Sequence, residues 1–152
     1  MFDVVVIGSG PAGYVAAIRA SQLGLKTLCI EELSNDKGKP NFGGTCLNVG
    51  CIPSKSLLDS SHRYYEAKKN LSDHGIQLGD VKLDLKTMME RKDNIVSKLT
   101  GGIDGLFLTN KVESICGKGK VISKNTVQID KADGSSEKVD AKNIIIATGS
   151  SP

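Results

Sequence analysis

Val4-Val5-Val6-Ile7-Gly8-Ser9-Gly10-Pro11-Ala12-Gly13 is the stretch that decides the fold of this 152-residue chain. Its first four residues form a short apolar run with the β-branched composition of a buried strand. A glycine-rich turn follows, and an alanine-rich stretch from about Pro11 to Leu23 predicts a helix that Gly24 ends. The stretch therefore predicts a strand, a tight turn and a helix in direct succession.

A second strand is predicted at 27–30, where Thr-Leu-Cys-Ile follows the helix. Two strands joined by a crossover helix pair in parallel, so residues 3–31 form a βαβ unit. Glu31 stands at the end of the second strand, 18 residues after Gly13. Strand, glycine turn, helix, second strand and terminal acid together are typical of a dinucleotide-binding unit.

The GxGxxG pattern has a physical role at each glycine. Gly8 allows the tight turn, Gly10 lets the backbone approach a pyrophosphate, and Gly13 lets helix and strand pack closely. Free N–H groups at the helix amino terminus would hold the phosphates, and Pro11, which has no N–H of its own, and Ala12 would lie beside the cofactor. Glu31 would accept a hydrogen bond from a ribose hydroxyl and disfavour a 2′-phosphate. The motif alone does not separate FAD from NAD, and a purely structural glycine turn in another α/β protein is the alternative.

Composition sets limits on partners and location. The chain is 39% hydrophobic, and its 20 Lys and Arg against 17 Asp and Glu are scattered, which predicts one globular domain with a solvated surface and neither a nucleic-acid nor a membrane partner. No apolar stretch has the length of a signal region or a membrane span. We therefore expect a reducing compartment, either the cytoplasm or an organelle matrix after removal of a transit peptide. Cysteines in such a compartment are typically catalytic or metal-binding.

The rest of the chain predicts two long helices and several short strands. Residues 34–41 are polar and predict a surface loop. Helical periodicity covers about 53–69 and 85–108, although Gly101-Gly102 weakens the second helix. After the second helix, short strands separated by turn residues are predicted at 112–116, 119–122, 125–130, 136–140 and 143–147. They predict an antiparallel meander that returns the chain to the parallel sheet. The expected fold class is thus α/β, Rossmann-like, with a parallel sheet, flanking helices and an antiparallel β-meander.

Cys46 and Cys51 are separated by four residues within the segment GGTCLNVGCIPSK, residues 43–55. They can close a small disulfide ring if the segment turns back at a helix start, and the neighbouring glycines permit that bend. A helix amino terminus at Cys51, with Lys55 one turn further on, would favour its thiolate. Two alternatives remain open from the residues alone: half of a zinc site, which would need two more ligands, or two unlinked buried thiols.

The same segment resembles the redox-active segment of the flavoprotein disulfide reductases, and CLNVGCIPSK is most similar to the dihydrolipoamide dehydrogenase branch of that pyridine nucleotide-disulfide oxidoreductase family. The resemblance extends over the glycine fingerprint, residues 97–103 and the closing Ile-Ala-Thr-Gly-Ser of 146–150. It implies an FAD-binding domain over residues 1–152, as the amino-terminal segment alone, without the NAD-binding and dimerisation domains of the family.

Residue roles follow from the resemblance. It implies that Cys46 exchanges disulfides with the substrate, that Cys51 lies against the flavin in a charge-transfer contact, and that Lys55 sits near flavin N5. It also places at the cofactor the residues Gly44, Thr45, Thr148 and Gly149. Since no segment matches the family's carboxy-terminal His and Glu pair, His62 and His74 are expected to be surface residues.

The resemblance also implies the reaction. A thiolate of dihydrolipoamide attacks Cys46, Cys51 passes two electrons to FAD, and a hydride reaches NAD⁺. Expected partners are the lipoyl domain of a 2-oxo acid dehydrogenase complex and a second copy of the parent chain, as a homodimer. The fragment alone is expected to be inactive. The alternatives are another disulfide reductase, of the glutathione or mercuric type, or a freestanding FAD-binding redox module.

Overall fold

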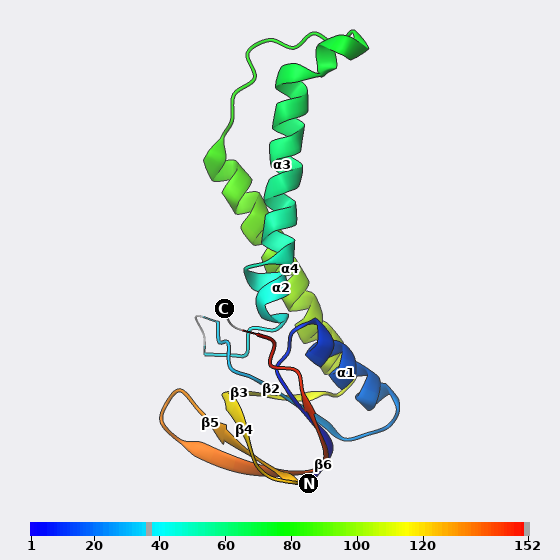
Figure 1. Ribbon diagram of the computed structural model, residues 1–152, viewed down its shortest axis with the longest axis vertical. Helices are drawn as coiled ribbons and strands as arrows, with labels where there is room; N and C mark the ends of the chain where they lie inside the picture. Colours follow the sequence, from blue (N-terminus) through cyan, green and yellow to red (C-terminus); the bar gives the residue numbers. More distant parts are fainter. Residues whose placement is uncertain (36–37, 151–152) are drawn as a thin grey trace.

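The computed structural model describes residues 1–35 and 38–150, over which a six-stranded mixed sheet and flanking helices form the structure (Figure 1). The strand order is β3-β2-β1-β6-β5-β4. The strands are β1 (Phe2–Ile7), β2 (Thr27–Glu31), β3 (Glu113–Cys116), β4 (Lys118–Ser123), β5 (Thr126–Asp130) and β6 (Ser136–Ile146). The helices are α1 (Pro11–Gln22), α2 (Gly44–Asn48), α3 (Cys51–Lys69) and α4 (Leu85–Thr109), with a 3₁₀ turn, η1, at Leu71–His74.

The predicted βαβ unit is confirmed. β1 pairs in parallel with β2, with Val4 opposite Thr27, and α1 connects them. The helix ends at Gln22, and Gly24, directly after the C-cap residue Leu23, has a positive φ of 82° that suits a residue without a Cβ. The Rossmann-like α/β class is therefore correct.

Alternation along β1 divides the core into two layers. Val4 and Val6 pack on the side of α1 and α4, where Phe107 closes the cluster. Val5 and Ile7 point to the opposite face and pack against the β5 side chains Val127 and Ile129. Because successive strand residues face opposite sides, one apolar strand holds helices on one face and the meander on the other.

The strands predicted at 136–140 and 143–147 are one continuous strand, β6. Its first part pairs antiparallel with β5, from Ser136 to Asp140, and its second part pairs in parallel with β1, from Ala141 onward. Asn125 stabilises the changeover, since its side-chain Nδ2 donates to the Ala141 carbonyl at 2.7 Å. The polar residues 142–143 look like a break in the sequence but remain in extended backbone.

The strand predicted at 112–116 does not belong to the antiparallel meander. β3 pairs in parallel with β2 at the edge of the sheet, with Glu31 opposite Cys116. The meander consists of β4, β5 and the first part of β6. A strand's partner depends on contacts distant in sequence, which its own residues do not specify.

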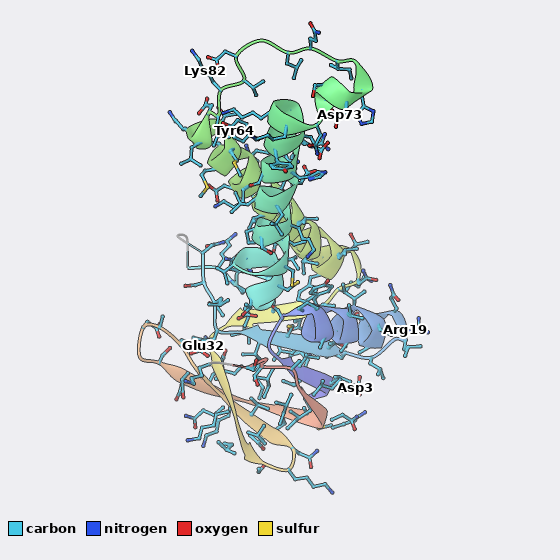
Figure 2. The ribbon with its side chains drawn as sticks, turned by 45° about the horizontal axis from the view of Figure 1, so that its top comes forward. Asp3, Arg19, Glu32, Tyr64, Asp73 and Lys82 are labelled. Carbon is cyan, nitrogen blue, oxygen red and sulfur yellow. The ribbon has the colours of Figure 1, made fainter. Side chains whose placement is uncertain are left out.

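α3 and α4 lie alongside each other and project away from the sheet (Figure 1). Figure 2 shows Asp73 and Lys82 at the far end of this hairpin. α4 runs without interruption through Gly101-Gly102, and in this helix only Ile103 and Phe107 are buried. α3 begins at Cys51, two residues before the predicted start at Pro53, so the proline lies within the first turn. The short helix α2 was missed because five residues show no period.

Two further features concern the surface. The polar loop predicted at 34–41 includes residues 36–37, which lie outside the described residues, and its described ends join in a bridge between Ser34 and Pro40. In the described part of the chain, no helix is both long enough and apolar enough to cross a membrane.

Candidate functional site

A cavity of about 830 Å³ opens at the carboxyl ends of the parallel strands. We call it the strand-end cavity. In an open α/β sheet this edge is where ligands bind, and the volume is in the usual range for cofactors, about 300–1,000 Å³. Its wall consists of residues 7–12, 31–33, 44–46, 50–51, 117–119 and 147–150.

The glycine turn forms one wall of the cavity. A Cβ at Gly8 would lie 2.3 Å from the Ala147 carbonyl oxygen, so no larger residue fits between β1 and the end of β6. Gly10 is the N-cap of α1 and makes no side-chain capping bond, and Pro11 and Ala12 of the first turn line the cavity. The amino terminus of α1 thus presents its partial positive charge to the cavity.

Glu31 is buried in the same wall, with 6% of its surface exposed. Its Oε2 accepts a hydrogen bond from the Ser9 backbone N–H at 2.8 Å and another from the Ser9 hydroxyl. Its Oε1 accepts from the Leu33 N–H at 2.8 Å. The carboxylate is held in one orientation at the rim of β2, where we expected a ribose-binding acid.

The segment that carries the cysteines packs directly on the glycine turn. Gly43, the N-cap of α2, has a φ of 103°, and its N–H donates to the Ser9 carbonyl at 3.0 Å. A Cβ at Gly44 would lie 2.8 Å from Gly10 Cα, so the two backbones meet without side chains between them. This close contact brings Cys46 to the dinucleotide fingerprint.

Cys46 and Cys51 are brought together by a turn between two helices. Cys46 is in α2 and Cys51 is the first residue of α3; between them, the Gly50 N–H donates to the Thr45 carbonyl at 2.7 Å. Asn48 stabilises the turn, since its amide donates to the Phe42 and Gly44 carbonyls at 3.1 and 2.9 Å. The bend that the glycines predicted is present.

Both cysteines are free thiols. Hydrogen bonding with the Cys51 thiol raises the pKa of Cys46; burial and the charge of Cys51 act in the same direction, whereas the Cys51 backbone N–H lowers it. Both residues line the strand-end cavity. Two adjacent thiols in a ligand cavity can form a disulfide and exchange it with a dithiol.

Most of the expected cofactor residues line the strand-end cavity, and two do not. Gly44, Thr45, Thr148 and Gly149 are in its wall with the glycine turn. Gly13 lies beneath the turn, where a Cβ would be 1.8 Å from the Gly8 carbonyl oxygen, as close helix–strand packing requires. Lys55 is exposed on α3, one turn beyond Cys51, and is not in the wall. Its role at the flavin stays a prediction.

Other segments of the wall were missed from the sequence. Gly117, Lys118 and Gly119 follow β3, and a Cβ at Gly119 would lie 2.8 Å from Ile7 Cγ2. The sequence signal that could have identified these residues is the pair of glycines, Gly117 and Gly119, directly after a predicted strand. Ser9, Glu32 and Leu33 were also missed, and Figure 2 shows Glu32 at the sheet end of the molecule.

The alternatives for the cysteines can be compared with this geometry. Among residues 1–35 and 38–150, no group of three His, Cys, Asp or Glu side chains is placed to hold a metal ion. Cys29 fits the description of a merely buried thiol, with burial and the nearby Glu31 raising its pKa to about 12. His62 and His74 are exposed, as expected.

Comparison with known proteins agrees with this geometry. The family model described as pyridine nucleotide-disulphide oxidoreductase matches residues 2–152. The chain belongs to this family. Membership in the pyridine nucleotide-disulphide oxidoreductases accounts for a thiol pair and a dinucleotide fingerprint in one cavity.

Similar curated proteins carry two kinds of name. Leghemoglobin reductase of Vigna unguiculata is 59% identical over 97% of this chain, which covers 27% of that protein. Dihydrolipoyl dehydrogenase 1, mitochondrial, of Arabidopsis thaliana is 57% identical, and dihydrolipoyl dehydrogenase, mitochondrial, of Sus scrofa is 56% identical, each over 97% of this chain and 28% of the relative. The chain thus spans little more than a quarter of the length of these family members.

Proposed function

We propose that this chain is the amino-terminal segment of an FAD-binding domain, in an enzyme that oxidises dihydrolipoamide and reduces NAD⁺. One observation carries the proposal: the Cys46–Cys51 thiol pair lines the same cavity as the glycine turn and Glu31. The similar dihydrolipoyl dehydrogenases support this choice over a glutathione or mercuric reductase and over a freestanding redox module.

The residues of the strand-end cavity fit FAD. The uncapped start of α1 offers N–H groups to a pyrophosphate, and Gly8, Gly10 and Gly44 keep the adjoining backbone clear of side chains. The fixed Glu31 carboxylate offers an acceptor to the adenosine ribose. We propose as the holding residues Gly8, Gly10, Pro11, Ala12, Glu31, Gly44, Thr45, Cys51, Thr148 and Gly149, with Gly13 supporting the turn and Lys55 approaching from α3. Bound FAD would accept two electrons from the thiol pair and supply the hydride for NAD⁺.

The thiol chemistry belongs to the chain itself. A thiolate of dihydrolipoamide attacks Cys46 Sγ of the oxidised pair, the Cys46–Cys51 bond breaks, and Cys51 leaves as a thiolate. The second substrate thiolate then attacks the substrate sulfur of the mixed disulfide, which releases lipoamide and the Cys46 thiolate. The pair gains two electrons and the substrate loses two. We assign the leaving role to Cys51 because it begins α3, where the helix dipole stabilises a negative charge.

Partners and location follow from the same proposal. We propose that the substrate is presented by the lipoyl domain of a 2-oxo acid dehydrogenase complex, and that the whole protein is a homodimer. Of the two compartments that the sequence left open, we propose the mitochondrial matrix, because matching dihydrolipoyl dehydrogenases are named mitochondrial.

Turnover of the purified full-length protein tests this function. We expect NADH formation with dihydrolipoamide and NAD⁺, and little NADPH oxidation with glutathione disulfide. Cys46→Ser should abolish turnover, by a factor on the order of a thousand or more, since no thiolate remains for exchange. Cys29→Ser is the matched control, because Cys29 is buried behind the wall of the cavity and a serine hydroxyl can also donate to the Gly8 carbonyl, which Cys29 Sγ contacts at 3.8 Å. Turnover with glutathione disulfide alone would contradict the proposal.

A further inference from the structure

Ser9 occupies the first non-glycine position of the GxGxxG pattern and is fully buried. Its N–H, hydroxyl and carbonyl groups all form hydrogen bonds. Its backbone N–H and its hydroxyl both donate to Glu31 Oε2, and its carbonyl accepts from the Gly43 N–H at 3.0 Å. A glycine or alanine at this position could form the same turn and the same backbone bonds. The hydroxyl therefore adds one specific contact, a hydrogen bond to the Glu31 carboxylate.

The Ser9 hydroxyl completes the set of donors around Glu31. The Leu33 N–H holds Oε1 at 2.8 Å, and Ser9 holds Oε2 with two donors. A carboxylate has about four lone-pair positions on its two oxygens, so a further position remains for a donor from the cavity. Hydrogen bonds to an ionised acceptor are stronger than neutral ones. The orientation of Glu31 toward the cavity therefore depends on Ser9.

We propose that Ser9 is a positioning residue that fixes the Glu31 carboxylate to bind the ribose of the adenosine half of the nucleotide. This inference rests on the proposed function, in which the cavity holds FAD. Ser9 acts on the nucleotide through Glu31, and the charge-assisted bond limits rotation of the carboxylate. Loss of the hydroxyl would leave the Glu31 carboxylate held by the Ser9 and Leu33 backbone N–H groups alone and less restricted in rotation. Binding of the adenosine half would then weaken while contacts to the flavin half stay.

Nucleotide affinity separates this role from a merely structural one. The full-length protein, stripped of flavin, is titrated with FAD and with FMN, which lacks adenosine. Ser9→Ala should raise the Kd for FAD about tenfold, as the loss of one charge-assisted hydrogen bond implies, and leave the Kd for FMN within about twofold. Thr27→Val is the control, because it removes another buried hydroxyl, which donates to the Leu25 carbonyl at 3.0 Å outside the wall of the cavity. It should change neither Kd.

A double-mutant cycle tests the route through Glu31. Glu31→Ala alone should weaken FAD binding, and adding Ser9→Ala should then change the Kd by less than about twofold. If Ser9→Ala does not fold, Ser9→Cys keeps a weak donor and should show a smaller rise in the Kd for FAD alone. Equal weakening of FAD and FMN, or independent effects in the cycle, would overturn the positioning role and leave the proposed function standing. A parent protein that binds no FAD would refute both.

Discussion

Gly13→Ala should destabilise the chain strongly, because the third glycine of the turn has no room for a methyl group. A Cβ there would lie 1.8 Å from the Gly8 carbonyl oxygen and 2.8 Å from its carbon. Real Cβ atoms keep at least 3.0 Å from such neighbours, so α1 and the turn must separate by 1.2 Å or more. Gly8 cannot yield easily, since its N–H donates to the Ile30 carbonyl at 2.8 Å and the N–H of the next residue, Ser9, donates to Glu31 Oε2 at 2.8 Å.

The expected loss is about 3 kcal/mol of unfolding free energy, at the upper end of the range for overpacked cores. The clash is with backbone atoms, and moving α1 away from the turn would also open the contact of Ala17 with the core. Gly101→Ala is the matched control. Gly101 is also inside a helix, but a Cβ there would meet nothing within 4 Å. Alanine should therefore stabilise the chain at this position by up to about 1 kcal/mol.

Urea unfolding of the flavin-free chain, followed by far-ultraviolet circular dichroism, measures both changes. The two substitutions are chemically the same, and both are in helices, so the opposite signs isolate the effect of the contact with Gly8. Equal unfolding free energies for Gly13→Ala and the parent chain would refute the close packing of α1 on the turn.

Two further predictions concern the thiols. In the reduced protein, Cys51→Ala should lower the pKa of Cys46, because it removes the hydrogen bond that raises this pKa. Alkylation of Cys46 by iodoacetamide, followed by peptide mass spectrometry, should then show a pH profile with a lower midpoint. An unchanged midpoint would contradict this prediction. Cys29 has its pKa raised from 9.0 to about 12, mainly by burial. The folded chain then keeps a proton that the unfolded chain releases, so stability should fall between about pH 9 and 12 by up to about 1.4 kcal/mol per pH unit. Cys29→Ala should make this alkaline slope shallower by that amount, and a slope equal to the parent's would show that Cys29 is not held neutral by the fold.

Local patterns in the sequence determined the βαβ unit, the two long helices and the two cysteines with their glycine flanks. Each depends on interactions between residues close along the chain: the apolar run 4–7, the turn at Gly8, and the helical period of 85–108. The four intervening residues and the glycine flanks also showed that the two thiols can meet, whereas their redox role came from the resemblance of this segment to the flavoprotein disulfide reductases.

Tertiary structure alone decided which strands pair and what surrounds the cavity. β3 joins β2 in parallel and β6 pairs with β1, because pairing is set by contacts between segments distant in sequence: Leu28 pairs with Glu113, 85 residues further on, and Phe2 with Ala141, 139 residues further on. The same folding brings Gly117–Gly119 into the wall of the cavity and buries Ser9 against Glu31. A sequence shows which residues can form a strand or turn, but the burial and hydrogen-bond partners of a side chain exist only once distant segments are packed together.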